Sequence, residues 1–422
     1  MPVHVHYPSP PVVPSCAQCA FQAGITHALS LLPSPSSSSS SSASSAFSSR
    51  SSTPPTTPNT PPSDYTPSPS PGCSTPPLEP LPLPFDFPAS SSSPAPPRAP
   101  FGADEEQQYL DLARRIATEG EDRPAVKGGV GARALFSPPP LSFSLSSPAD
   151  PSNPFSTAHT LHVPLLSTKT VPFPLVAKEL VWFLSGSSSE HDLAREGCHI
   201  WRAHGAREYL DARGLTDNEE GDLGPVYGFQ WRHAGAEYRG AKEDYEGKGV
   251  DQLAELVRRI KEEPQKRKLI LCAWSASDFD KMALAPCPCF VQFYVHSPKP
   301  AGLFSTPQAR LSCAVYQRSA DIALGLPFDI VTYALLTHTL AHLTSLVPHT
   351  LHFHLGDAHV YADHLAPLQT QLAREPKGWP ELRWTRGREE IEREGGVDGV
   401  TVGDWEVVGY APEGRVRYAL HP

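Results

Sequence analysis

Residues 175–185 restrict the fold more than any other segment, because they are apolar on nearly every side of a helix. A helix of this kind is stable only when other elements enclose it, so the chain must build a large core. A second largely apolar helix is predicted at residues 330–346. The first segment also carries one acid, Glu179, and a buried acid has to be explained by pairing or by function.

This core must come from the chain after residue 100. The first 100 residues hold 25 of the 49 prolines and only five of the 80 Asp, Glu, Lys and Arg residues. A segment of that composition buries too little apolar surface to offset its chain entropy, which predicts a disordered Pro/Ser-rich tail at 1–100. The remaining residues, 104–422, are expected to form one folded domain.

The order of the predicted elements indicates an α+β fold, with a mixed β-sheet packed by helices, because strands and helices do not alternate regularly. Amphipathic helices are predicted to begin at Asp104 and at Asp251, each of which can cap the helix that follows it. Two Pro-rich stretches, near 137–160 and at 298–308, are predicted to be insertions. Strand patterns lie at residues 269–274, 290–295, 311–316 and 351–355.

Composition also bears on the compartment and the partners. The chain has no apolar run of about 18 residues, and its first residues lack a basic region followed by an apolar stretch. Eight scattered cysteines in 422 residues fit a reducing compartment, and a net charge of -10 argues against a general nucleic-acid-binding surface. We expect a cytoplasmic protein, with nuclear or mitochondrial pools left open, that requires neither a membrane nor an obligate nucleic acid.

Residues 317–321, Gln-Arg-Ser-Ala-Asp, have the composition of an anion clamp. The guanidinium of Arg318 offers a planar fork to a phosphate, and Ser319 adds a hydroxyl donor. Together with the basic pair at 267–268, these groups could enclose one phosphate. Asp329 follows the serine by ten residues and can face the base that the phosphate anchors. The segment therefore predicts a nucleotide ligand.

Cys287 lies on a proline-flanked turn just before a predicted strand, where its sulfur can be exposed at an edge. A thiolate nucleophile needs such exposure together with positive neighbours. Tyr227, in a segment rich in turn formers and aromatics, could relay a proton near a reacting carbon. Neither the Cys16-Ala-Gln-Cys19 spacing nor the four histidines between 352 and 364 come with a complete ligand set, so no metal is predicted.

Taken in order, segments along most of residues 104–422 resemble the thymidylate synthase family. Chance agreement over eight ordered blocks is negligible. The blocks are residues 179–186, 200–201, 221–232, 272–274, 282–295, 316–329, 356–364 and 371–376. The resemblance implies a homodimer whose active sites combine residues of both subunits. It also implies methylation at C5 of a pyrimidine deoxynucleotide, with 5,10-methylenetetrahydrofolate as the donor of the one-carbon unit and of hydride.

The resemblance also implies roles for individual residues. Cys287 matches the nucleophile that adds to C6, Glu179 the acid that organises water and proton transfer, and Tyr227 the tyrosine near the C5 proton. Burial of Glu179 is expected to raise its pKa toward the working range. His421-Pro422 occupy the place of the segment that closes over the ligands. The residues that match nucleotide ligands are Lys127, Arg267, Lys268, Gln317, Arg318, Ser319, Asp321, Asp329, His359 and Tyr361, with Arg267 and Lys268 reaching in from the neighbouring subunit. The residues that match the folate-contacting wall are Ile200, Trp201, Asp321, Gly325 and Phe328.

Four positions depart from the family pattern. Asp329 stands where the family has an asparagine that accepts from uracil N3–H and donates to O4. An ionised carboxylate can only accept, whereas a protonated acid satisfies cytosine, and the dCMP hydroxymethylases carry an acid here. Pro288 replaces a histidine, and His204 replaces an asparagine that faces the folate. Lys127 replaces an arginine in a glycine-rich loop, where Arg123 could substitute.

The sequence therefore predicts a methyltransferase of the thymidylate synthase type, with conversion of dUMP to dTMP as the leading activity. Asp329 supports a second hypothesis, a dCMP methylase or hydroxymethylase. The changes at Pro288, Lys127 and His204 support a third hypothesis, a catalytically weak relative that binds a nucleotide or RNA.

Overall fold

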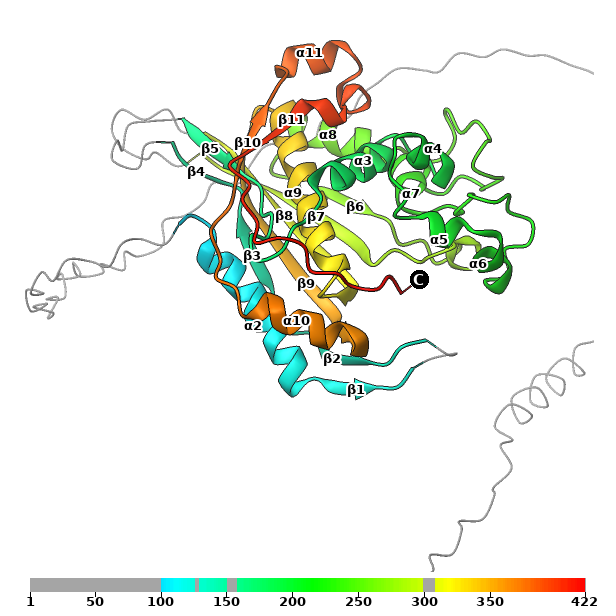
Figure 1. Cartoon of the computed structure of the whole chain (residues 1–422). Coiled ribbons are helices and arrows are strands. Elements are labelled where there is room, and N and C mark those ends of the chain that lie inside the picture. The colour runs from blue at the N-terminus through cyan, green and yellow to red at the C-terminus, as the bar shows by residue number, and fades with distance from the viewer. Residues whose placement is uncertain (1–99, 126–128, 150–157, 299–307, 422) are drawn as a thin grey trace, which may run out of the picture. The chain divides into compact units, whose positions relative to one another are not determined.

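The computed structural model describes residues 100–125, 129–149, 158–298 and 308–421 (Figure 1). Apart from its last residue, the tail predicted at 1–100 lies outside them, as do Lys127 and Pro422. The described residues combine two sheets with packed helices, which confirms the predicted α+β fold.

The larger sheet of the described residues has seven strands. Six follow the order β1-β2-β9-β8-β7-β6, and β3 pairs with the first part of β9. All neighbours run antiparallel except β8 and β9, which are parallel and are connected through helix α9. The bounds are β1 Glu121–Arg123, β2 Ala132–Phe136, β3 Leu141–Ser144, β6 Ile270–Cys272, β7 Pro288–His296, β8 Arg310–Asp321 and β9 Val347–Tyr361.

The smaller sheet has four strands in the order β11-β10-β5-β4, all antiparallel. Its bounds are β4 Ser146–Pro148, β5 His159–His162, β10 Glu381–Trp384 and β11 Trp405–Val408.

Strands β3 and β4 lie within the stretch that the sequence predicts to be an insertion near 137–160. Leu141 and Phe143 alternate toward the core and are only 3% and 0% exposed, so this part of the stretch belongs to the sheet. The prolines at 138–140 precede this strand and favour a loop, so the sequence pattern does not predict the strand. Residues 150–157 of this stretch, and 299–307 of the second one, lie outside the described residues.

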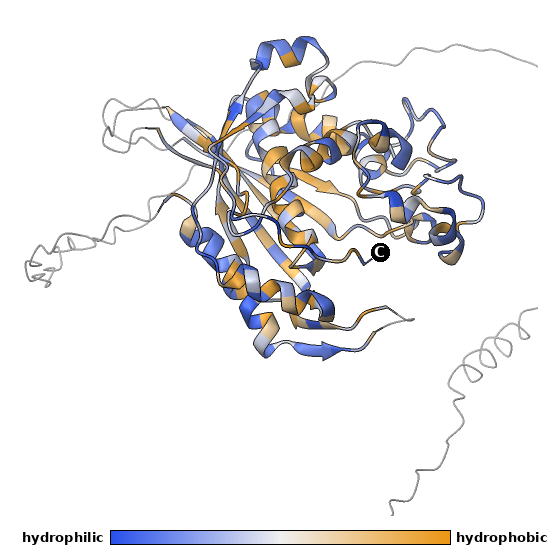
Figure 2. Cartoon of the chain, in the orientation of Figure 1, coloured by the Kyte–Doolittle hydropathy of each residue, from blue (hydrophilic) through white to orange (hydrophobic). Residues whose placement is uncertain are grey.

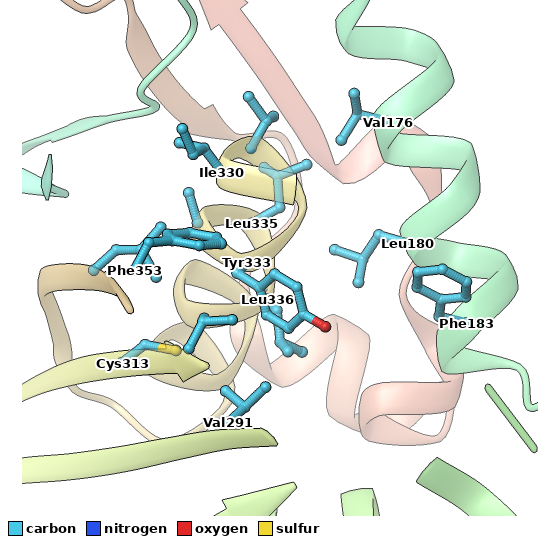
Figure 3. Packing of buried hydrophobic residues seen from close by; sticks show 14 of the residues in the cluster. Val176, Leu180, Phe183, Val291, Cys313, Ile330, Tyr333, Leu335, Leu336 and Phe353 are labelled. Atoms are coloured by element: carbon cyan, nitrogen blue, oxygen red, sulfur yellow. The ribbon is translucent and has the colours of Figure 1, made fainter. Parts of the chain in front are cut away.

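Two buried helices form the centre of the domain. Helix α9 (Gly325–Leu343) packs on β8 and β9, and α3 (Phe173–Leu184) packs on α9. Figure 3 shows the meeting of α3 side chains such as Leu180 and Phe183 with Tyr333 of α9. Both apolar helices are thus enclosed as predicted. Helix α9 begins five residues before the predicted start, because a proline is tolerated in a first helical turn.

The other helices surround this centre. Helix α2 (Ala103–Glu119) packs on β2, β3 and β9, and α10 (Leu365–Leu372) packs on α2. Figure 2 shows apolar residues gathered where helices meet strands and polar residues on α11. The remaining helices are α4 Glu190–Arg195, α5 Arg202–Gly205, α6 Arg207–Ala212, α7 Tyr227–His233, α8 Gln252–Glu262 and α11 Arg388–Arg393, with 3-10 turns η2 Phe279–Lys281, η3 Ala362–His364, η4 Gly396–Gly399 and η5 Val402–Asp404. Within the described ranges, no helix has the length and apolar character needed to cross a membrane.

The predicted helix starts at Asp104 and Asp251 have different outcomes. Asp251 caps α8, because its Oδ1 accepts the Ala254 N–H at 2.8 Å. The prediction that Asp104 caps the first helix is wrong. Asp104 lies inside the first turn of α2, and the N-cap is Gly102, whose φ of 85° favours glycine over an aspartate.

Candidate active site

The predicted nucleophile and the predicted proton relay lie together. Cys287 directly precedes β7, and its N–H donates a 2.8 Å hydrogen bond to the hydroxyl oxygen of Tyr227, the first residue of α7. The Tyr227 ring stacks on Phe183 at 4.7 Å between ring centroids. Burial, and then the nearby Cys287 thiol, raise the pKa of Tyr227 well above its ordinary value, so its hydroxyl stays protonated.

Arg318 of β8 brings positive charge to the thiol. Its Nη2 lies 4.0 Å from Cys287 Sγ, and its Nε and Nη2 donate to the carbonyls of Pro286 (3.0 Å) and Ala285 (2.7 Å). Contrary to expectation, the thiol is not exposed at a sheet edge, because β7 lies between β6 and β8 and the side chain is half-buried. This burial raises the pKa of Cys287 to about 11, although the guanidinium opposes the shift.

Glu179 of α3 lies in the same region, and its carboxyl group has a high pKa. Desolvation by burial raises its pKa to about 7, as predicted, and the hydrogen bond from Trp201 Nε1 (2.7 Å) opposes the shift. A carboxyl group in this range can both donate and accept a proton near neutral pH.

Asp329, in the first turns of α9, is a second acid of high pKa. Burial and the nearby Glu179 carboxylate raise its pKa well above the ordinary value. Gln317, which is 1% exposed, donates from Nε2 to Asp329 Oδ2 at 2.8 Å and leaves its own Oε1 without a partner. Since a neutral acid offers one donor and one acceptor, Asp329 can present the same pair of groups as an amide.

The ends of β8 and β9 bring the other predicted nucleotide ligands together. Asp321 and His359 are paired residues of the two parallel strands. Ser319 lies two residues before Asp321 in β8. Burial alone would raise the pKa of Asp321, but His364, with Nδ1 at 3.7 Å, holds it below the ordinary value. Tyr361 ends β9, with its ring 5.1 Å from that of His359.

Only some of the residues predicted to contact the folate lie close to one another. Trp201 is buried and contacts both Glu179 and Tyr227, the latter at 5.9 Å between ring centroids. Ile200 and Phe328 pack against the core, and Gly325 begins α9 with its Cβ position 3.7 Å from Asp321 Cβ. Trp201 thus borders Glu179 and Gly325 borders Asp321.

The basic pair Arg267 and Lys268 does not join Arg318 within one chain. Both residues are exposed and precede β6, where the Phe293 N–H donates to the Leu269 carbonyl at 2.8 Å. That register places them beside the far end of β7, away from Cys287. Within one subunit these groups therefore do not enclose one phosphate, and the entry of Arg267 and Lys268 from a neighbouring subunit stays a prediction. Arg123 lies on the outermost strand, β1, and pairs with Glu121.

Sequence reasoning missed a buried lysine. Lys169 is 4% exposed and donates to the Ala323 carbonyl, and its Nζ lies 5.0 Å from the Tyr418 ring centroid. Burial lowers its pKa to about 7, against the attraction of Asp321. The signal in the sequence is its position as the only charged residue of 163–171. Trp274, whose ring lies 5.6 Å from the Arg318 guanidinium, was also missed as a partner of the clamp.

His204 stands where the family has an asparagine, and its imidazole is neutral near neutral pH. Burial lowers its pKa to about 4, its Nδ1 has no hydrogen-bond partner, and its ring lies 5.4 Å from that of Trp201. The histidines of β9 do have polar partners that the sequence did not predict: Asp357 for His359 at 3.1 Å and Ser142 for His352 at 2.8 Å.

A half-buried thiol beside a guanidinium, with two acids of high pKa and a buried tyrosine, defines the site of an enzyme that works through a cysteine nucleophile. The family model for thymidylate synthase matches residues 107–421. The chain belongs to the thymidylate synthase family.

Curated relatives agree with the family model. The chain is 46% identical to the thymidylate synthase of Agaricus bisporus, over 75% of this chain and 97% of the relative. It is 41% identical to the thymidylate synthase of Homo sapiens, over 79% of this chain and 95% of the relative. It is also 44% identical to a probable thymidylate synthase of Schizosaccharomyces pombe, where the match spans 78% of this chain but 50% of the relative's length.

Proposed function

We propose that this chain methylates C5 of dUMP to give dTMP, with 5,10-methylenetetrahydrofolate as the donor of both the one-carbon unit and the hydride. The observation that carries the proposal is the meeting of Cys287, Arg318 and Glu179 at one site in a chain of this family. The reaction is a methyl transfer with reduction, so the products are dTMP and dihydrofolate.

Each step has a candidate group. Sγ of Cys287 bonds to C6 of the uracil, and C5 becomes a carbanion equivalent that attacks the methylene group of the folate. The C5 proton then passes to a solvent water beside the Tyr227 hydroxyl, and the folate departs to leave an exocyclic methylene. Hydride from the folate reduces that methylene while the bond between Sγ and C6 breaks. Arg318 favours the thiolate by its charge, and Glu179 exchanges protons with the base.

The experiment is a turnover assay with purified full-length chain. Dihydrofolate is followed by absorbance, and the nucleotide product is separated by chromatography. We expect dTMP from dUMP, and a Cys287→Ser variant that forms none. No product from dUMP with a folded protein would contradict the proposal. The reaction as written uses no metal, and a chelator in the same assay checks that prediction.

Asp329 favours a second candidate, modification of dCMP. A neutral acid donates to cytosine N3 and accepts from its amino group as readily as it pairs with uracil. The same assay with dCMP decides between the two. Equal or better turnover of dCMP would overturn dUMP as the main substrate, and the product distinguishes methylation from hydroxymethylation.

We further infer that the chain works as a homodimer through the open face of the larger sheet. Support comes from three aromatic side chains of β7 and β8 on this face. Phe290 and Tyr316 are directly paired and 38% and 44% exposed, and Tyr294 is 62% exposed. An aromatic patch of this kind marks an interaction surface. Arg267 and Lys268, exposed and remote from Arg318, are free to enter a partner's site.

A further inference from the structure

The last part of the chain, residues 409–421, contains no helix or strand, yet it is fixed along its length. The Glu413 N–H donates to the Ser167 carbonyl at 2.8 Å, and the Thr170 N–H donates to the Gly414 carbonyl at 3.1 Å. These bonds tie the segment to the buried stretch that precedes α3. The first half of the segment is thus held by backbone contacts.

A second anchor lies at Tyr418. Its hydroxyl donates to Gln371 Oε1 at 3.0 Å, and Lys169 Nζ lies 5.0 Å from the ring centroid. Beyond this point apolar burial cannot hold the chain, because Leu420 is 52% exposed. The final residues must be held by polar contacts.

Those polar contacts come from η3. His364 Nε2 lies 2.8 Å from the Ala419 carbonyl oxygen, and His421 Nε2 lies 3.0 Å from both carboxylate oxygens of Asp363. The side chains of His421 and Asp363 are 18% and 41% exposed. The His421 ring also packs against Tyr361, at 4.4 Å between ring centroids.

Tyr361 is therefore held from two sides, by His359 of its own strand and by His421 of the C-terminal segment. We propose that Asp363 and His421 form a clasp that fixes the end of the chain over Tyr361 and positions this ring for the nucleotide. His421 and Asp363 are positioning residues, because they act through Tyr361. The contribution to nucleotide binding rests on the proposed function, whereas the clasp itself rests on the contacts alone.

A bound metal is the competing explanation for the same residues. Potential ligand atoms of Asp363, His364 and His421 lie within 4.8 Å of one another. However, the Nε2 atom of His364 donates to the Ala419 carbonyl, and its Nδ1 lies 3.7 Å from Asp321 Oδ1, so both ring nitrogens face other groups. The clasp needs only the carboxylate and the imidazole. All measurements below are therefore made with a chelator present, and a clasp that is lost in chelator would overturn the proposal.

Trypsin provides a test that does not depend on turnover, since Arg415 and Arg417 are exposed just before the clasp. The variants are Asp363→Ala and His421→Ala, with Leu420→Ala as the matched control in the same segment. We expect either clasp variant to be cleaved about threefold to fivefold faster than the unchanged protein, because the end of the chain opens more often. Cleavage no faster than that of the Leu420 control would overturn the clasp.

Kinetics then test positioning. A partly exposed pair contributes up to about 1 kcal/mol, so KM for dUMP should rise about threefold to fivefold in each single variant, with a smaller change in kcat. The double variant Asp363→Ala/His421→Ala should resemble either single variant. The exchanged pair Asp363→His/His421→Asp should recover at least half of the loss in both assays. Additive losses, or no recovery, would overturn positioning through this contact. If the unchanged protein shows no turnover, the proposed function fails while the trypsin result still decides the clasp.

Discussion

At the scale of single residues, the contact between Gln317 and Asp329 explains how an acid can occupy a position where the family has an amide. Burial and the nearby Glu179 raise the pKa of Asp329 well above its ordinary value, which favours the neutral acid before the nucleotide binds. Gln317 Nε2 also donates to the Ser319 carbonyl at 3.1 Å, which fixes the amide with its nitrogen toward Asp329. The proton of a neutral acid can lie on either carboxyl oxygen, unlike the fixed donor and acceptor of an amide. A neutral Asp329 can therefore present either order of donor and acceptor to the base.

Replacing Asp329 with asparagine removes this freedom. An amide cannot donate to cytosine N3 while also accepting from the amino group in the geometry that suits uracil, so a mismatch costs about 1–3 kcal/mol. We expect Asp329→Asn to raise the ratio of kcat/KM for dUMP over dCMP by about tenfold to a hundredfold. Competition assays measure the ratio, with Asp280→Asn on the surface as the control. An unchanged ratio would show that Asp329 does not read the base.

The raised pKa of Glu179 predicts a pH dependence of stability. Between 4.5 and about 7 the folded state binds the Glu179 proton more tightly than the unfolded chain does, so the free energy of unfolding falls as pH rises through this window. Glu179→Gln keeps the hydrogen-bond acceptor for Trp201 and removes this cost. Its melting temperature should therefore exceed that of the unchanged protein at pH 8 and approach it at pH 5.

Activity should move in the opposite direction. Loss of a general acid or base slows turnover by about a hundredfold or more, so the same variant should be more stable and nearly inactive. Glu246→Gln, on the surface, provides the control for both measurements. A stability difference that does not change with pH would contradict the assignment of a high pKa to Glu179.

Part of this site follows from the sequence and part does not. Cys287, Tyr227 and Arg318 could be predicted, because thiol, phenol and guanidinium occur in segments whose residue types indicate their chemistry. The burial of Cys287, and hence its raised pKa, depends on segments such as those of Tyr227 and Arg318 that meet it only in the folded chain. Lys169 was missed because its partners, Ala323 and Tyr418, belong to distant segments.

At the scale of elements, the loop before Cys287 depends on the close approach of Gly224 to the Lys281 carbonyl oxygen. Gly224 has φ of 75°, and a Cβ there would lie 1.9 Å from the Lys281 carbonyl oxygen. Gly224→Ala suffers from both the positive φ and the steric clash. We expect it to lower the free energy of unfolding by about 3 kcal/mol or more and to disturb the loop that leads to the nucleophile. Gly235→Ala, with φ of 81° and nothing within 4 Å, should lose only about 1–2 kcal/mol. Denaturant unfolding compares them, and equal losses would contradict the steric argument.

The elements that sequence patterns predict are those with long or strong periodicity. Helices α3 and α9 were predicted from long, largely apolar runs, and β7 and β8 from runs of alternating or apolar residues. The strands of the smaller sheet were missed because they span only three or four residues each. Elements of that length have no period to detect, and only their pairing in the folded chain defines them.

At the scale of the whole molecule, the proposed homodimer with shared active sites predicts complementation between two inactive variants. Cys287→Ala and the double variant Arg267→Ala/Lys268→Ala should each be inactive or weak alone. In mixed dimers, one site receives an intact nucleophile and an intact basic pair, so activity should partly return after unfolding and refolding together. The same mixture made from Cys287→Ala and Cys287→Ser is the control. No recovery, with dimers shown by sedimentation, would contradict shared sites.

The parallel pairing of β8 with β9 has a consequence for how the chain matures. These strands can pair only after the 19 residues of α9 have crossed between them, and such non-local pairing is slow to form. Until then the Cys287 thiol lacks the surroundings that raise its pKa to about 11, and it ionises more readily than in the finished fold. We therefore expect Cys287 to be oxidised more readily in the unfolded chain than in the folded protein, which its oxidation rate with and without denaturant would test.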